Sequence, residues 1–164
     1  MGDATGALER HLDRLAVEDF YADYVACLDE NRLEEWPDFF VEEGLYGLWS
    51  KENWDAGLPA PMFLCRNRRQ MCDRVTSFRE ANLYPVHWNR HLVSSTRVTA
   101  SDATEIKASS NYAVLQTRLS GETFIYQSGR AHDVFLRGPD GLRLKERRLV
   151  YDTLAVQTLF VMPV

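Results

Sequence analysis

Three long strand-like segments follow one another in the second half of the sequence, and they restrict the fold more than any other feature. Each is rich in β-branched and aromatic residues, and short glycine-containing connections separate them. Connections of this kind join neighbouring antiparallel strands. With His91–Thr99 as a fourth strand, the pattern predicts one strongly curved antiparallel or mixed sheet that includes Thr104–Leu119, Glu122–Arg137 and Leu142–Asp152.

The clearest helix is predicted over Leu8–Glu30. Leu8, Leu12 and Leu15 begin an apolar stripe, and further apolar residues continue it at spacings of three and four as far as Leu28. This period is typical of a helix that packs one face against a core. We expect the helix to lie on the sheet.

Shorter elements complete the first half. Asn31 is expected to end the first helix and to cap a short second one, because Glu34 follows at the spacing of a capping box. Leu45–Trp49 is compatible with a short strand, and Arg66–Ala81 is predicted to be helical. Helices followed by a run of strands indicate an α+β fold, and the length of 164 residues fits a single domain over residues 1–164.

Both faces of the predicted sheet carry apolar residues. In the first long strand Ile106 and Val114 point one way, while Ala113 and Leu115 point the other. A sheet with one face in water should alternate more cleanly. We therefore expect the chain's own helices to cover one face and another molecule to cover the other. The apolar end, 154–164, is predicted to be a final strand in the core or in a subunit contact.

Composition excludes several classes of function. The net charge of −5 argues against nucleic-acid binding, which needs a basic face. No apolar run approaches the roughly 20 residues that span a bilayer, and the first residues lack the apolar core of a signal peptide. Three cysteines suggest no disulfide framework. A cytoplasmic protein without membrane contact is expected.

Motifs for metals and nucleophiles are weak. His87 and His91 have helical spacing, but the adjacent position is Trp88 rather than the glutamate of a zinc motif. No cysteine and histidine pairs resemble a Rieske site. We expect no metal or cofactor site in this chain, and we interpret the cysteines as core residues. They are Cys27, Cys65 and Cys72.

One acid–base constellation stays open. Asp23, Tyr24 and Asp29 on the first helix could face a cavity on the concave side of the sheet, because a carboxylate in an apolar cavity can act as a general base. The residues expected opposite are His91, His132 or Asp133. The alternative places both aspartates on the polar face of the helix and Tyr24 in the core.

Several blocks of the sequence resemble the small (beta) subunit of aromatic ring-hydroxylating dioxygenases. The blocks occur in family order over nearly the whole chain, and the similarity is greatest to the branch acting on aromatic carboxylates such as anthranilate, salicylate or terephthalate. Gly47 and Trp54 depart from the family pattern. The blocks are Asp19–Tyr24, Leu28-Asp29, Arg32–Phe40, Lys51–Trp54, Gly57–Pro59, Asp73–Val75, Asn89–Leu92 and Glu146–Asp152.

The resemblance implies a cone-shaped α+β fold of the nuclear-transport-factor-2 type, with N-terminal helices on the concave face of the sheet. It also implies a homotrimer within an α3β3 assembly, whose large subunit carries a Rieske [2Fe–2S] cluster and a mononuclear non-haem iron. The small subunit is mainly structural in this family. No activity is then expected for the isolated chain, although the complex is an oxidoreductase.

Two functional hypotheses follow. The first is a non-catalytic subunit without catalytic residues of its own, whose subunit contacts we expect to include Asp73, Arg74, Arg90, His91, Arg147 and Arg148. The second is a free-standing dehydratase, isomerase or small hydrolase of the same cone fold, with Asp23, Tyr24 and His91 as its acid–base residues.

Overall fold

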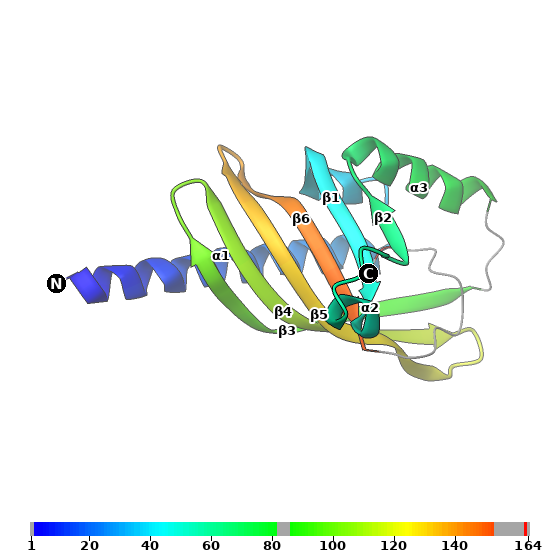
Figure 1. Cartoon of the computed structure of the whole chain (residues 1–164). Helices are drawn as coiled ribbons and strands as arrows, with labels where there is room; N and C mark the ends of the chain where they lie inside the picture. Colours follow the sequence, from blue (N-terminus) through cyan, green and yellow to red (C-terminus); the bar gives the residue numbers. More distant parts are fainter. Residues whose placement is uncertain (1, 82–85, 153–162, 164) are drawn as a thin grey trace.

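The structure is a computed structural model that describes residues 2–81, 86–152 and 163 (Figure 1). Helices and two strands alternate up to residue 81, and a continuous run of four strands follows, in agreement with the predicted α+β class. The elements in chain order are α1 (Gly2–Asp29), η1 (Trp36–Phe39), β1 (Phe40–Ser50), α2 (Lys51–Asp55), β2 (Phe63–Cys65), α3 (Arg68–Ala81), β3 (His87–Ser101), β4 (Glu105–Arg118), β5 (Thr123–Gly138) and β6 (Gly141–Tyr151).

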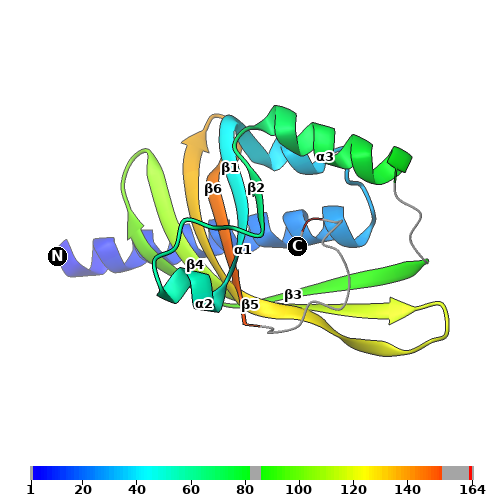
Figure 2. The same ribbon diagram turned by 45° about the vertical axis from the view of Figure 1, so that its right-hand side comes forward.

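The strands form one six-stranded mixed sheet in the order β2-β1-β6-β5-β4-β3. The predicted meander is β3–β6, whose neighbouring strands are antiparallel. β1 pairs with β6 in parallel and with β2 on its other side, so the segment predicted as a short strand is part of a longer inner strand. Figures 1 and 2 show the strands curling around α1, with α2 on the opposite side.

Helix α1 has two apolar faces rather than one. Val17, Tyr21 and Leu28 are buried against the sheet, whereas the leucines nearer the N-terminus lie on the opposite side, because each residue turns a helix by about 100°. The prediction of one continuous stripe is therefore wrong. In Figure 1 the first part of α1 extends beyond the edge of the sheet. The outward leucines are Leu8 (58% exposed), Leu12 (56%) and Leu15 (40%).

The connection after α1 differs from the predicted capping box. Asn31 has a positive φ of 59°, which ends the helix as expected. Glu34 does not cap a second helix, because both its carboxylate oxygens accept hydrogen bonds from Arg79 on α3, at 2.7 and 3.0 Å. Arg79 also donates to the Asn31 carbonyl at 2.8 Å. One guanidinium thus connects α3 to the end of α1, and a short 3-10 helix, η1, replaces the predicted α-helix.

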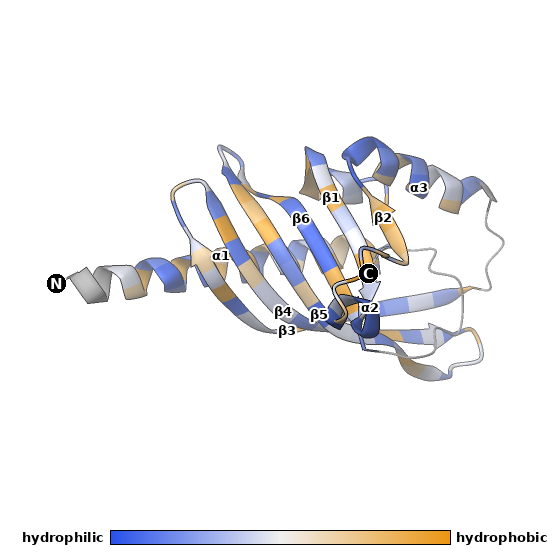
Figure 3. Cartoon of the chain, viewed as in Figure 1, coloured by the Kyte–Doolittle hydropathy of each residue, from blue (hydrophilic) through white to orange (hydrophobic). Residues whose placement is uncertain are grey.

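The two faces of the sheet are packed differently. Along β4 the residues facing α1 are buried, and those between them are half-buried or exposed. Figure 3 shows the corresponding alternation of polar and apolar residues along the strands. Gly129 lies where β5 and β6 approach so closely that a Cβ would overlap the Val150 carbonyl. The predicted final strand, 154–164, lies outside the described residues except for the buried Pro163.

Candidate functional site

A buried ion pair crosses the concave face of the sheet. Asp133 on β5 and Arg147 on β6 are direct cross-strand partners, and Arg147 Nη1 lies 2.6 Å from Asp133 Oδ2. The Tyr21 hydroxyl on α1 donates to the same carboxylate oxygen at 2.7 Å. Burial raises the pKa of Asp133, while the charge of Arg147 and the Tyr21 hydrogen bond act in the opposite direction. This network ties the first helix to the two central strands.

Tyr24 lies one helical turn further along α1 and belongs to the same core. Its hydroxyl accepts a 2.8 Å hydrogen bond from Trp36 Nε1, and the Arg147 guanidinium lies 4.6 Å from its ring centroid. Burial raises the pKa of Tyr24 to about 12. The phenol therefore keeps its proton at neutral pH and acts here as a packed core group.

A second polar pair joins the end of α1 to the edge strand β3. Asp29 Oδ1 lies 2.7 Å from His91 Nδ1 and accepts a 3.1 Å bond from the His91 backbone N–H. Because a carboxylate accepts hydrogen bonds, the Nδ1 atom carries the proton in this contact. The other ring nitrogen, Nε2, is buried without a partner among the described residues. Because β3 is an edge strand, its outward N–H groups could pair with a strand of another molecule, and Asp29 occupies one of them.

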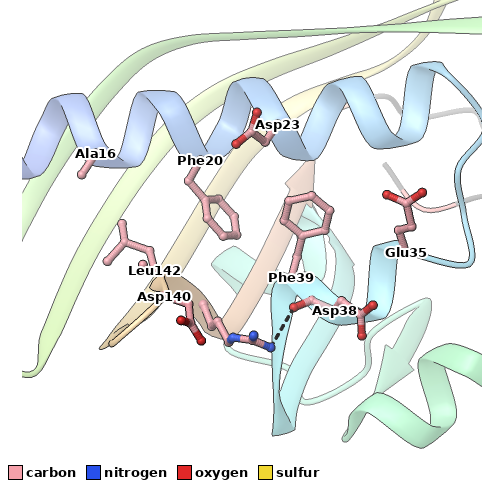
Figure 4. Close-up of a pocket in the computed structure, with 10 residues that line it drawn as sticks. Ala16, Phe20, Asp23, Glu35, Asp38, Phe39, Asp140 and Leu142 are labelled. Carbon is pink, nitrogen blue, oxygen red and sulfur yellow. Dashed lines mark hydrogen bonds between the residues drawn. The ribbon is translucent and has the colours of Figure 1, made fainter.

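Asp23 lies elsewhere, on the exposed side of α1. It lines a groove of about 510 Å³ between α1, η1 and the turn that joins β5 to β6 (Figure 4). The groove has an apolar floor made by Phe20, Phe39 and Leu142. Its remaining lining residues are Ala16, Glu35, Asp38, Asp140, Gly141 and Arg143.

The residues of the acid–base hypothesis therefore occupy three environments. Asp23 faces the outer groove, Tyr24 lies in the core against Trp36, and His91 lies against Asp29. The structure does bring together Asp29 with His91, and it places Asp133 opposite the first helix. Tyr21, which joins Asp133, was missed by sequence reasoning, although its position three residues before Tyr24 puts it on the same helix face.

An aromatic cluster covers part of the convex face. We use the name convex cluster for Trp49 on β1, Trp54 on α2, His132 on β5 and Arg148 on β6. The Trp54 and His132 rings stack with centroids 5.2 Å apart, and Trp49 meets Trp54 edge-on at 5.8 Å. Burial lowers the pKa of His132, and the charges of Arg130 and Arg148 lower it further. A hollow of about 590 Å³ adjoins this cluster between α2 and β4–β6.

The convex cluster explains the two departures from the family pattern. A Cβ on Gly47 would overlap the Trp49 ring, so glycine at this position lets the indole lie on the sheet. Trp54 then extends the stack from Trp49 to His132. The two unusual residues therefore belong to one packing arrangement.

The six residues expected at subunit contacts are distributed unevenly. Arg147 and His91 are buried inside the chain. Arg147 contacts Asp133 on the concave face, and His91 contacts Asp29. The structure therefore gives both residues an internal role in place of the expected subunit contact. Arg74 is partly buried over the Phe63 ring. The remaining three, Asp73, Arg90 and Arg148, are wholly or partly accessible.

Neither the cysteines nor the histidines gather into a ligand set in the part of the chain that the structure describes. No group of three or more histidine, cysteine, aspartate or glutamate side chains there could hold a metal ion. Cys27 and Cys65 are buried as predicted, and burial raises the pKa of each thiol to about 11. Cys72 is exposed, which corrects its interpretation as a core residue.

No described helix is long and apolar enough to cross a membrane. Helix α1 is the longest, and charged residues interrupt its apolar positions throughout.

Comparison with known proteins identifies the family. The chain matches the family described as SnoaL-like domain over residues 9–148. It is 46% identical over 141 residues to the anthranilate 1,2-dioxygenase small subunit of Burkholderia cepacia, covering 86% of this chain and 88% of that protein. It is 32% identical over 152 residues to subunit beta 2 of the terephthalate 1,2-dioxygenase terminal oxygenase component of Comamonas sp., covering 93% and 99%.

Solved structures agree. A beta subunit assigned to an aromatic-ring-hydroxylating dioxygenase of Novosphingobium aromaticivorans superposes with a TM-score of 0.86 at 40% identity, covering 94% of this chain and 98% of that one. The benzoate 1,2-dioxygenase beta subunit of Burkholderia mallei gives a TM-score of 0.70 at 15% identity over 83% and 88%, which shows the fold alone. The chain belongs to the SnoaL-like domain family and, within it, to the small subunits of aromatic-ring-hydroxylating dioxygenases.

Proposed function

We propose that this chain is a structural, non-catalytic subunit of a dioxygenase that acts on an aromatic carboxylate. The observation that carries the proposal is the 46% identity to an anthranilate 1,2-dioxygenase small subunit over 86% of the chain. The complex works in aromatic catabolism in the cytoplasm. Its large subunit carries the Rieske cluster and the mononuclear iron, and the two subunits form an α3β3 assembly around a trimer of this chain.

The interior of the fold supports a structural role. The two charges on the concave face that lie nearest the middle of α1, Asp133 and Arg147, are paired with each other and with Tyr21. These contacts connect α1 to the two central strands, so the pair is suited to holding the helix on the sheet. Catalysis by this chain would instead need acid–base groups that converge on an accessible cavity.

The test is purification of the tagged chain from its own organism grown on an aromatic acid. We expect a larger protein to co-purify in equal molar amount, with the visible absorbance of a [2Fe–2S] cluster and oxygen-dependent turnover that the small chain lacks. Isolation of the chain by itself, with its own turnover of an aromatic acid, would overturn the proposal.

A matched pair of variants tests the expected subunit contact. Arg90 is an exposed residue of β3, and Arg10 is an exposed residue of α1. If Arg90 contacts the large subunit, Arg90→Glu should reduce the co-purified amount at least fivefold, whereas Arg10→Glu should leave it unchanged. Equal recovery with both variants would remove Arg90 from the interface.

A further inference from the structure

The outer side of α1 carries a continuous row of apolar residues. The row consists of four residues at successive spacings of four, namely Leu8, Leu12, Ala16 and Phe20. The first three are exposed, and Phe20 is half-buried. Leu15 lies beside Leu12 and widens the row. We use the name outer ridge for these five residues. Large apolar side chains that gather on one exposed face indicate a surface for another molecule.

The outer ridge leads into the groove between α1, η1 and the β5–β6 turn. Ala16 and Phe20 belong to both, and Phe39 and Leu142 extend the apolar floor away from the helix (Figure 4). From Leu8 to Phe20 the row is about 18 Å long, at a rise of 1.5 Å per residue. A straight apolar row that ends in a groove matches the shape of a second helix of about three turns.

The charged residues on this side of α1 are all acidic. They are Glu9, Asp19 and Asp23, and each is exposed. Since each residue turns the helix by about 100°, all three lie within about 60° of Leu12, whereas Arg10 and Arg14 lie about 160° away from it. Arg14 is also paired with Glu18, at 2.9 Å. The outer ridge is therefore flanked by negative charge that no arginine of α1 offsets.

The groove carries charge of the same sign. Asp23 and Asp140 lie on opposite sides of its floor, and neither has an ion-pair partner among the described residues (Figure 4). The carboxylates of Glu35 and Asp38 are paired with arginines outside the lining. Arg143, the one basic residue among the described residues of the lining, donates a 3.2 Å hydrogen bond to the Asp38 backbone carbonyl. A cation that enters the groove would therefore meet the carboxylates of Asp23 and Asp140.

These charges select the kind of partner. An acidic surface repels the phosphate groups of nucleic acids and of anionic membranes, but it attracts lysine and arginine. The apolar row suits the apolar face of a helix, because two helices pack by placing the rows of one beside the rows of the other. A helix with apolar residues on one face and basic residues along its flanks meets both requirements.

We propose that the outer ridge and the groove bind an amphipathic helix of another protein, whose apolar face is flanked by lysine or arginine. The apolar side chains of that helix pack on Leu12 and Phe20, and its basic side chains reach Asp23 and Asp140. This surface lies on the α1 side of the sheet and the convex cluster on the α2 side, so the two can be occupied independently (Figures 1 and 2). A second copy of this chain is the competing occupant.

The probe is a synthetic helical peptide with leucine on one face and lysine on both flanks of that face. The control peptide has glutamate in place of each lysine. Fluorescence anisotropy with the full chain should show saturable binding of the lysine peptide and at least tenfold weaker binding of the glutamate peptide. Binding of the lysine peptide should weaken as the salt concentration rises, because salt screens exposed charges.

Matched variants test the surface itself. Leu12→Gln should weaken binding of the lysine peptide at least tenfold, whereas Leu58→Gln should leave it unchanged, although the two leucines are similarly exposed, at 56% and 51%. Asp23→Lys should weaken binding at least fivefold, and Glu52→Lys on the exposed surface of α2 should not. All four residues are exposed, so the melting temperatures should stay close to that of the wild type.

Three results would overturn the proposal: no saturable binding of the lysine peptide, equal binding of the two peptides, or equal effects of Leu12→Gln and Leu58→Gln. Light scattering tests the competing occupant. If Leu12→Gln lowers the solution mass of the chain by itself, the outer ridge binds a second copy, and the proposal of a different partner is wrong.

Discussion

On β5 and β6, two cross-strand pairs that are one step apart along the chain occupy opposite faces of the sheet. Asp133 and Arg147 face the concave side, and their neighbours His132 and Arg148 face the convex side as direct cross-strand partners. The Arg147 side chain is 1% exposed and the Arg148 side chain is 39% exposed. The same residue type therefore carries a buried charge in one position and a solvated charge in the next.

This difference shows how the chain divides its tasks. The concave face is closed by the chain's own α1, whose Tyr21 reaches the Asp133 carboxylate. The convex face is covered in part by the short helix α2 through the Trp54–His132 stack. Exposed apolar side chains continue beyond that stack on the strands β3 and β5, namely Trp88, Leu92 and Ile125. A face of this composition is suited to contact with another subunit.

The largest expected effect breaks the buried pair. Arg147→Leu leaves the Asp133 carboxylate buried without its cation, and removing one partner of a buried ion pair costs about 3–5 kcal/mol. Urea denaturation should show this loss in the free energy of unfolding. Arg148→Leu, one residue along on the convex face, should cost less than about 1 kcal/mol, since exposed ion pairs contribute little. Equal losses for the two variants would contradict the division between the faces.

A smaller effect is expected from overpacking the convex cluster. Gly47→Ala places a methyl group where the Trp49 ring lies, and forced repacking of this kind costs about 1–3 kcal/mol. The double variant with Trp49→Ala should lose less than the sum of the two single variants, because the clash disappears with the ring. Additive losses, measured by thermal or urea unfolding, would show that Gly47 does not serve the indole.

The smallest effect concerns pH. The pKa of His132 is lowered by burial and by Arg130 and Arg148, so the folded chain binds a proton there less readily than the unfolded chain. Its contribution to stability is complete above the unfolded pKa of about 6.5 and is lost as the pH falls through the folded pKa. The loss should be smaller than about 1 kcal/mol, because solvent screens this partly exposed group. His132→Gln should remove it.

The control for the pH experiment is His11→Gln on the exposed part of α1. Between pH 7.5 and pH 5, the free energy of unfolding of this variant should change with pH as steeply as that of the wild type. If the free energy of unfolding of His132→Gln also changes with pH as in the wild type, His132 is not the cause of the loss of stability at low pH.

Local patterns predicted the fold well, and they did so for physical reasons. The glycine connections and strand-like segments near the end of the sequence predicted the meander β3–β6, because these signals act between chain neighbours. The parallel pairing of β1 with β6 is a contact between distant segments, and no local pattern reports it. The stripe of α1 was misread because Leu8, Leu12 and Leu15 have helical spacing among themselves but a different phase from Val17 and Leu28.

The candidate sites show the same limit. Sequence reasoning placed Asp29 and His91 on facing elements, and the structure brings them together at 2.7 Å. It could not distinguish Arg147 from Arg148, because one residue decides which face of a strand an arginine occupies. The role of Gly47 was also hidden, since it depends on where the Trp49 ring lies in three dimensions.

The most direct test of the account is the solution mass of the purified chain, measured by light scattering together with its visible absorbance. The account predicts a colourless assembly of three chains of 18.9 kDa each, in which the convex face takes part in subunit contact. A stable monomer that turns over an aromatic substrate without any partner would contradict it.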